Sequence, residues 1–234
     1  MKGKEGLRII GLIRAKNAAK YLPELLDQMS VFCNQILLLD GGSADDTVAI
    51  AESRGAMARL TMPGSEFHEG RDRIHLHRWA EEFNPDWIYA PDTDELLEAG
   101  GAEKIRDVVF GAEGVKIEAL RFPFLYLWGD RRHYRVDGIY KDITAVRLFK
   151  YLPDLTPPDR EVHSMAVPME LLKRGKFCRS EIRLLHFGYM TAQDRAEKYR
   201  WNCYHYPPGS RGYAWAGGKG YDHILGRDAE IEEM

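Results

Sequence analysis

Short apolar segments of strand length alternate with helical patterns along the first part of the chain. Three of them are nearly continuous: residues 7–13 (LRIIGLI), 35–40 (QILLLD) and 87–90 (WIYA). Runs of this kind are typical of strands that are buried on both faces of a parallel sheet. We therefore predict a buried sheet to which these three segments contribute.

The segments that join and follow the strands have the spacing of helices. Between the first two strands, apolar residues recur at spacings of one, three and four: Tyr21, Leu22, Leu25, Leu26 and Met29. This spacing gives a helix one apolar face, and Pro23 is tolerated in its opening turn. A second helix is predicted from Ala44 to Arg54, with Gly55 as its stop. Alternating units of this kind build an open, doubly wound α/β sheet, whose ligand crevice lies beyond the carboxyl ends of the strands.

Two polar turns follow strands of this predicted sheet, so we expect them to meet at one edge of it. The sequence DGGS begins at Asp40, and the sequence DTDE begins at Asp92. Three carboxylates within four residues repel one another unless something neutralises them, and such oxygen-rich clusters suit hard divalent ions. The alternative is a helix N-terminus, where acids are favoured and where Asp92 or Thr93 is the cap.

Beyond residue 110 the pattern changes. Residues 115–128 (VKIEALRFPFLYLW) are rich in aromatic and β-branched residues without helical spacing, and residues 144–150 (TAVRLFK) form another predicted strand. His186 interrupts a later apolar run, and a helix is predicted over residues 192–204. Residues 207–234 include segments too rich in Gly and Pro for regular structure, so we expect a flexible tail or a lid.

Composition favours one compact cytoplasmic protein. The 234 residues are 44% hydrophobic, which is enough for one core of this class. A net charge of −3 and the lack of a long basic run argue against a nucleic-acid-binding protein. Three scattered cysteines favour a reducing compartment, and no signal peptide or transmembrane span is visible. The basic and aromatic stretch from Lys198 to Trp215 is the candidate for contact with a membrane surface, and the sequence does not specify an oligomeric state.

Roughly the first hundred residues resemble family 2 glycosyltransferases of the GT-A fold. Residues 9–56 read as a strand, a turn with a basic residue and Asn, a helix, and a strand that ends in an Asp-Gly-Ser-x-Asp-like turn, and residues 91–97 (PDTDELL) are similar to the family's Asp-x-Asp motif. The resemblance implies a GT-A type single domain, with a Rossmann-like mixed sheet flanked by helices. It makes residues 1–110 the nucleotide-sugar-binding half and residues 111–206 the acceptor-binding and catalytic half, followed by the tail of residues 207–234.

The resemblance also implies roles for individual residues. Asp40 stands where the family's acid recognises the nucleotide base, although this chain has Gly41 where many relatives have a second Asp. Asp92 corresponds to the acid that contacts the ribose. Asp94 corresponds to the acid that binds the metal ion, and Thr93 lies between the two in the nucleotide-sugar-binding set.

Three more residues are expected beside the nucleotide. Arg14 and Asn17 lie on the turn after the first strand, and Arg71 lies in the histidine- and arginine-rich residues 66–79. The alternatives are an ordinary solvated turn and a solvated basic helix face. We prefer the solvated face for three neighbours of Arg71: Arg73, His77 and Arg78. A zinc site is not favoured, because no matching Cys pair or HExxH arrangement is present.

The reaction implied by the resemblance needs a base that removes the proton of the acceptor hydroxyl. The candidates are Asp137, Asp159 and Glu161, and we favour Glu161. For each, the alternative is a surface loop carboxylate. His186 matches by position a late histidine that completes metal coordination in many GT-A enzymes, with a hydrogen-bonded core histidine as the alternative. Glu95 either supports the metal or caps a following helix.

The chain is thus predicted to be a metal-dependent glycosyltransferase. The donor is a nucleoside diphosphate sugar, with UDP favoured by family habit, the cofactor is Mn²⁺ or Mg²⁺, and the acceptor is a carbohydrate or lipid-linked hydroxyl. Transfer with inversion, in polysaccharide or glycoconjugate synthesis, is inherited from the resemblance. Aromatic side chains of the second half either stack on sugars or form core: Tyr126, Trp128, Tyr134 and Tyr140. The alternative functions are a non-catalytic nucleotide-sugar-binding relative and a sugar nucleotidyltransferase, although the Gly-rich phosphate loop expected of the latter is missing after Arg14.

Overall fold

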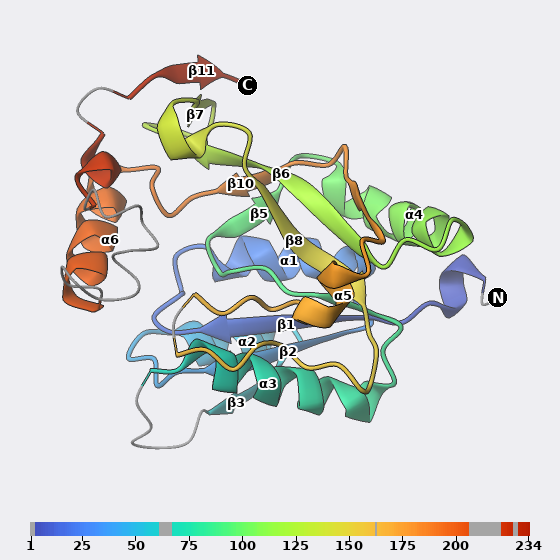
Figure 1. Cartoon of the computed structure of the whole chain (residues 1–234). Coiled ribbons are helices and arrows are strands. Elements are labelled where there is room, and N and C mark those ends of the chain that lie inside the picture. Colours follow the sequence, from blue (N-terminus) through green and yellow to red (C-terminus); the bar gives the residue numbers. More distant parts are fainter. Residues whose placement is uncertain (1–2, 61–66, 162, 206–220, 227–228) are drawn as a thin grey trace. The chain divides into compact units, whose positions relative to one another are not determined.

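The computed structural model describes residues 3–60, 67–161, 163–205, 221–226 and 229–234. Two compact units make up the chain: residues 1–123 with 144–183, and residues 124–143 with 184–234. Figure 1 shows the helices and strands of both. Among the described residues, no helix combines the length and the apolar character needed to cross a membrane.

The first unit holds most of the sheet. Its strands are β1 (Ile9–Ala15), β2 (Gln35–Asp40), β3 (Met57–Leu60), β4 (Trp87–Tyr89), β5 (Glu95–Leu97), the first part of β6 (Ala119–Leu127), β8 (Thr144–Lys150) and β9 (Phe177–Arg179). Its helices are α1 (Leu22–Phe32), α2 (Thr47–Ser53), α3 (Glu69–Ala80), α4 (Gly101–Gly114) and α5 (Met169–Lys173). The second unit holds the rest of β6, β7 (His133–Arg135), β10 (Leu184–His186), β11 (Ile231–Glu233) and α6 (Ala192–His205).

The strand order in the first unit is β6-β8-β4-β1-β2-β3. Strands β4, β1, β2 and β3 are parallel, whereas β8 is antiparallel to both β4 and β6. The chain runs outward from β1 through β2 to β3 and then returns to the other side of β1 as β4. The strand order therefore reverses between β1 and β4, which is where open α/β sheets bind their ligands.

Strand β1 is buried on both faces, as its apolar run predicts. Ile10 and Leu12 pack in one core cluster with Leu76 and Trp79 of α3. Gly11 faces the opposite side, where an added Cβ atom would lie 2.2 Å from the end of the Met29 side chain of α1. Alternation along the strand thus places α1 and α3 on opposite faces of the sheet (Figure 1).

The helix expected directly after the Asp92 turn is not there, so the helix-cap interpretation of Asp92, Thr93 and Glu95 is wrong. Strand β5 follows instead, and the next helix, α4, begins only at Gly101. The reason is a tertiary contact with α1. The side-chain amide of Gln28 in α1 both donates to the carbonyl of Leu97 and accepts from its N–H, each at 2.9 Å, which holds β5 in an extended conformation.

In the second unit, β7 pairs antiparallel with β6 and β11, and β10 pairs parallel with β6. Trp128 and Tyr140 are only 5% and 4% exposed, and the Arg135 guanidinium lies over both rings, at 4.7 and 4.3 Å from their centroids. Both rings are therefore core, as the core interpretation predicted for them. Residues 207–220 and 227–228 of the predicted tail or lid lie outside the described residues, so the lid stays a prediction, whereas β11 at its end is a regular strand paired with β7.

His77 on α3 is 2% exposed, with its ring 4.9 Å from that of Tyr151, so the solvated position expected for it is wrong. Burial lowers the pKa of His77 from 6.5 to about 4, although nearby Glu81 opposes the shift. The unfolded chain therefore binds this proton near pH 6.5 and the folded protein only near pH 4. The contribution of His77 to stability is complete above pH 6.5 and is lost as the pH falls toward 4, by about 3 kcal/mol in total.

A prediction follows for urea unfolding between pH 4 and pH 7. In His77→Phe, the free energy of unfolding should fall less steeply with decreasing pH than in the wild-type protein. The same change at exposed His75, two residues away, should leave the pH dependence as it is. Equal pH slopes for wild type and His77→Phe would contradict the assignment.

Candidate active site

The predicted site residues of the first unit gather at one edge of its sheet. Strand β1 ends at Ala15 and pairs there with Asp40, the last residue of β2. Strand β4 runs parallel to β1 on the other side and leads into the turn that contains Asp92. Because the three strands are adjacent and parallel, their carboxyl ends lie at the same edge. The expectation that the two acidic turns meet there is confirmed.

Asp40 shapes the turn that follows it. Its side chain is 3% exposed and accepts hydrogen bonds from the N–H groups of Gly42 and Ser43, both at 3.0 Å, and from the Ser43 hydroxyl at 2.5 Å. Gly42 has a φ of +81°, a conformation that glycine adopts without strain. The carboxylate is therefore held in one orientation at the end of β2.

Asn17 ties the turn after β1 to the turn after β2. It takes a left-handed conformation with a φ of +51°. Its side-chain carbonyl accepts from the N–H of Ala44, and its own N–H donates to the Ser43 hydroxyl, both at 2.8 Å. Asn17 thus has a structural role at the position where the sequence predicts a nucleotide contact.

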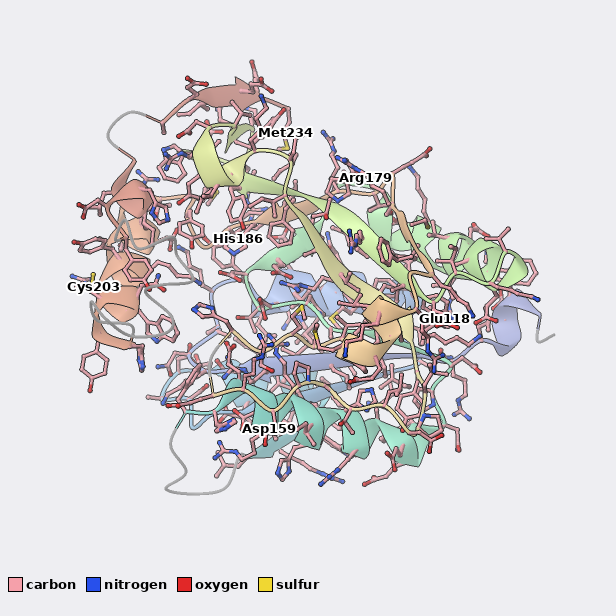
Figure 2. All side chains as sticks on the ribbon, viewed as in Figure 1. Glu118, Asp159, Arg179, His186, Cys203 and Met234 are labelled. Atoms are coloured by element: carbon pink, nitrogen blue, oxygen red, sulfur yellow. The ribbon has the colours of Figure 1, made fainter. Side chains whose placement is uncertain are left out.

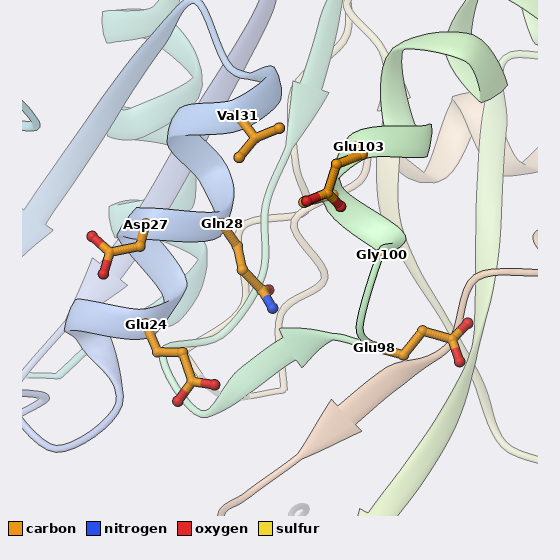
Figure 3. A pocket seen from close by; sticks show the side chains of 8 residues that line it. Glu24, Asp27, Gln28, Val31, Glu98, Gly100 and Glu103 are labelled. Atoms are coloured by element: carbon orange, nitrogen blue, oxygen red, sulfur yellow. The ribbon is translucent and has the colours of Figure 1, made fainter.

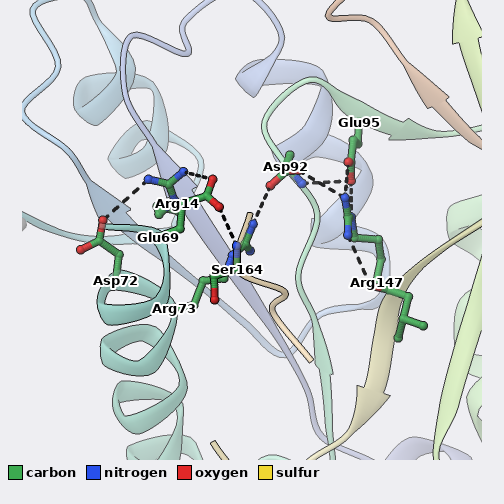
Figure 4. A network of polar contacts seen from close by, with 9 residues as sticks. Arg14, Glu69, Asp72, Arg73, Asp92, Glu95, Arg147 and Ser164 are labelled. Atoms are coloured by element: carbon green, nitrogen blue, oxygen red, sulfur yellow. Dashed lines mark hydrogen bonds and ion pairs between the residues drawn. The ribbon is translucent and has the colours of Figure 1, made fainter. Parts of the chain in front are cut away.

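Arg14 lies within β1, not on the turn after it as predicted, and Arg71 lies in the first turn of α3. Both pair with carboxylates of that turn, and Figure 4 shows the contacts of Arg14. The Arg14 guanidinium is 3.0 Å from Glu69 and 3.7 Å from Asp72, and Arg71 is 2.9 Å from the same Asp72. Arg14 also lies over the ring of Phe67, 4.7 Å from its centroid. The structure therefore brings these two predicted residues together.

The turn after β4 is held by two arginines that the sequence reasoning did not assign to the site. Glu95 is 1% exposed, and its two oxygens accept hydrogen bonds from Nε and Nη2 of Arg147, each at 2.5 Å. Arg147 Nη2 also lies 3.2 Å from Asp92 Oδ2, while Arg73 Nη2 lies 3.2 Å from Asp92 Oδ1. Figure 4 shows both guanidiniums directed at the turn.

Arg73 is therefore not on a solvated helix face, because its side chain is only 11% exposed and contacts Asp92. Arg147 carried a signal that reasoning from the sequence missed. It is a charged residue in the middle of the predicted strand TAVRLFK, and such a residue needs a partner if it is buried.

The charges of the Glu95 and Arg147 pair depend on each other. Burial raises the pKa of Glu95 to about 7, and the guanidinium of Arg147 works against that rise. Burial alone would disfavour the charge of Arg147, but Glu95 and Asp92 together raise its pKa above the usual value. Removing either partner would leave the other as a buried charge with less compensation.

The polar network at this edge of the sheet is balanced in charge, and Figure 4 labels all of its members except Arg71. Four arginines meet four carboxylates: Arg14, Arg71, Arg73 and Arg147 with Glu69, Asp72, Asp92 and Glu95. Asp40 and Asp94, at the same sheet edge, add negative charge. In the described part of the chain, no group of three His, Cys, Asp or Glu side chains is placed to hold a metal ion. A metal bound here needs further oxygen ligands, such as those of a phosphate.

The chain is similar to known proteins in sequence and in structure, but its sequence does not assign it to a family. No family model matches the chain. Uncharacterized proteins of Mycobacterium tuberculosis (Rv3786c) and Mycobacterium bovis (Mb3815c) are each 27% identical over 199 residues, which cover 81% of this chain and 48% of the relative. The chain thus spans about half the length of the curated relatives it matches.

Solved structures of S. aureus TarS 1–349 match 94% of the chain. TarS in complex with UDP-GlcNAc has a TM-score of 0.55 at 14% identity, with 70% of that chain covered. The chain has the GT-A glycosyltransferase fold. Glucosyl-3-phosphoglycerate synthase from Mycobacterium tuberculosis, in complex with Mn²⁺, UDP and glucosyl-3-phosphoglycerate, matches 54% of this chain and 46% of its own, with a TM-score of 0.40 and 21% identity.

Within this GT-A fold, the first turn of α3 also holds the segment with two of the candidate bases. The N–H groups of Glu69 and Gly70 donate to the carbonyls of Glu161 and Arg160, at 2.9 and 2.8 Å. Gly70 allows this approach, because an added Cβ atom would lie 2.3 Å from the backbone nitrogen of Arg160. Asp159, labelled in Figure 2, and Glu161 both have exposed side chains.

The third candidate base, Asp137, lies in the second unit and is engaged by Arg135. Nε and Nη2 of Arg135 donate to its two oxygens, at 2.5 and 2.7 Å. These hydrogen bonds hold the pKa of Asp137 below its usual value. A carboxylate with a lowered pKa and both oxygens occupied is a weak proton acceptor, so the geometry favours the other two candidates.

His186 also lies in the second unit, at the end of β10 (Figure 2), and is 8% exposed. Its ring is 4.9 Å from that of Tyr126, 5.2 Å from that of Tyr189 and 5.5 Å from that of Phe124. Joint metal binding by Asp94 and His186 links residues of the two units and stays a prediction.

A surface hollow of about 260 Å³ lies between α1 and the start of α4 (Figure 3). Its lining includes four carboxylates: Glu24, Asp27, Glu98 and Glu103. A diphosphate would be repelled by this charge, and typical ligand pockets measure about 300–1,000 Å³. We therefore do not place a nucleotide there.

Proposed function

We propose that the protein is a metal-dependent glycosyltransferase that transfers a sugar from a nucleoside diphosphate sugar, UDP-sugar in the first instance, to a hydroxyl acceptor. One observation carries the proposal. The Asp-x-Asp turn leaves β4 at the point where the strand order reverses beside β1, in a fold shared with a protein solved in complex with UDP-GlcNAc. A nucleotide sugar bound at this reversal would contact the predicted site residues.

The donor would lie across the carboxyl ends of β4, β1 and β2. Asp40 is proposed for recognition of the base and Asp92 for contact with the ribose. Thr93 lies between the two acids of the motif. Arg14 of β1 and Arg71 of the first turn of α3 are proposed to face the nucleotide, while Asn17 holds the Asp40 turn in place. Apart from Thr93, these residues are held by hydrogen bonds or ion pairs of the protein itself, and such preorganisation lowers the cost of ordering on binding.

A divalent cation, Mn²⁺ or Mg²⁺, fits the charge of this edge. The arginines of the network are already matched by carboxylates, so they bring no surplus positive charge to a diphosphate. Asp94 supplies a hard oxygen ligand of the kind these ions prefer, and such ions are commonly held by one or two carboxylates together with substrate phosphates. When bound, the ion would stabilise the negative charge of the departing diphosphate.

Glu161 is proposed as the base, with Asp159 as its neighbour in the same segment and Asp137 as the weakest candidate. The carboxylate would take the proton of the acceptor hydroxyl while the hydroxyl oxygen bonds to the anomeric carbon. The bond from that carbon to the diphosphate oxygen breaks as the new bond forms, so the sugar inverts. A carbohydrate or lipid-linked acceptor, peripheral contact with a membrane and a cytoplasmic location remain predictions.

The proposal is tested by calorimetric titration of the wild-type protein with UDP, GDP, ADP and CDP, each with Mn²⁺ and again with EDTA. We expect UDP to bind with Mn²⁺ and to lose its affinity with EDTA. Failure of every nucleotide to bind would contradict the proposal. If UDP binds in a metal-dependent way but the protein neither transfers the sugar nor slowly hydrolyses the donor, the result would instead support the non-catalytic alternative.

A further inference from the structure

We propose that Arg147 is a positioning residue that sets the geometry of the Asp-x-Asp turn, although it lies on β8 and outside the motif. The inference rests on the proposed function in one respect, because the turn is taken as the donor site. Arg147 would act through Asp92 and Glu95, whose positions it fixes before any ligand binds.

The backbone of Arg147 holds the start of the turn. Its carbonyl accepts a hydrogen bond from the N–H of Ala90 at 2.7 Å, one residue beyond the end of β4. The neighbouring pair in the register of the two strands is Tyr89 with Leu148. The point at which the chain leaves the sheet toward Asp92 is therefore fixed by residue 147.

The side chain of Arg147 holds the rest of the turn. Its planar fork binds both oxygens of Glu95, each at 2.5 Å, and reaches Asp92 Oδ2 at 3.2 Å. Glu95 in turn accepts from the N–H of Asp92 at 3.0 Å, and its own N–H donates to the Asp92 carbonyl at 3.1 Å. These contacts tie together the two ends of the four-residue segment whose middle residues are Thr93 and Asp94.

Stability alone does not account for this pair. Glu95 is 1% exposed and the Arg147 side chain is 18% exposed, so both charges have lost much of their hydration. Buried ion pairs of this kind are often no more stabilising than apolar side chains of similar size. Leu148 and Phe149, the next residues of β8, are fully buried and show that apolar residues suit this strand. A forked cation does what an apolar residue cannot, because it fixes the direction of two carboxylates at once.

The decisive experiment removes the fork without leaving a buried charge. In the double variant Glu95→Leu with Arg147→Met, apolar side chains replace both members of the pair, so the thermal midpoint should stay close to that of the wild type. We expect the affinity for UDP in the presence of Mn²⁺ to fall by about 10- to 100-fold, as when groups that orient metal ligands are removed. A stable double variant that binds UDP like the wild type would overturn the proposal.

Arg147→Lys is the second variant, because it keeps the charge and loses the fork. Hydrogen exchange of the protein without ligand should become faster at the amides of Asp92 and Glu95 and stay unchanged over residues 35–40. The control is Lys150→Met. Lys150 lies on β8, like Arg147, and its substitution breaks a 2.7 Å ion pair with Glu113 of α4. The control should match the wild type in exchange at the turn and in UDP affinity.

The two proposals fail in different ways. If the wild type binds no nucleotide, the proposed function is wrong, while the exchange measurement still decides the role of Arg147. If the wild type binds UDP and Arg147→Lys leaves both exchange and affinity unchanged, Arg147 does not position the turn. An equal loss of affinity in Lys150→Met would assign the effect to the stability of β8 and would also overturn the proposal.

Discussion

Asp94→Asn should abolish metal-dependent UDP binding and sugar transfer while leaving the thermal midpoint unchanged. Asp94 is partly buried in the turn between β4 and β5, and its carboxylate is the proposed protein ligand of the cation. The amide keeps the size of the side chain and removes its charge, which a hard cation requires for tight binding. In calorimetry, UDP with Mn²⁺ should bind Asp94→Asn as weakly as UDP with EDTA binds the wild type.

The matched control is the same acid-to-amide change one position further on. Glu95→Gln leaves the guanidinium of Arg147 without its principal partner, so it should lower the free energy of unfolding by about 3–5 kcal/mol. The two neighbouring acids should therefore differ in kind: one variant is stable and does not bind, and the other is destabilised. Equal effects of both variants on binding and on stability would contradict the separate roles assigned to the two acids.

Gly70→Ala should abolish transfer by displacing the segment that carries Asp159 and Glu161. The added Cβ atom would lie 2.3 Å from the nitrogen and 2.8 Å from the oxygen of the Arg160 backbone, and backbone atoms cannot move aside as the end of a side chain can. We expect a loss of stability of about 1–3 kcal/mol. Transfer rate, UDP affinity and the urea midpoint should be measured together.

Gly111→Ala is the control for this change, because it adds the same methyl group inside α4, where a Cβ atom meets nothing within 4 Å. It should stabilise the protein by up to about 1 kcal/mol and leave transfer intact. Glu161→Gln separates position from chemistry. It should keep the stability and the UDP affinity of the wild type and lose transfer. A Gly70→Ala protein with the wild-type transfer rate would remove the segment from the proposed reaction.

The sheet edge was predictable because local sequence patterns determine it. Strand β2 has the bounds that its apolar run predicts, Gln35 to Asp40, and β8 has those predicted for residues 144–150. Helix α1 follows from its apolar spacing and begins with Pro23 in its first turn. Once strands and helices alternate, a parallel sheet with polar turns at its carboxyl edge follows from general rules of connection.

What the sequence could not supply is long-range pairing. Arg147 lies 52 residues from Glu95, and nothing in the local pattern of either segment identifies the other as its partner. The helix expected after Asp92 failed for the same reason, since Gln28 of α1, 69 residues away, holds Leu97 in a strand. Arg73 was placed in solvent because its charge, taken alone, is typical of an exposed helix face.

The link between the turns after β1 and β2 affects how substitutions there should be interpreted. Besides the contacts of Asn17, the N–H of Ala18 donates to the Thr47 hydroxyl at 2.8 Å, and the N–H of Ala19 donates to Asp45 at 3.1 Å. These hydrogen bonds hold the two loops together, although more than twenty residues separate them in the sequence. A mutation in either loop therefore disturbs both. In a mutational scan, the effects of substitutions in the two loops should be interpreted together.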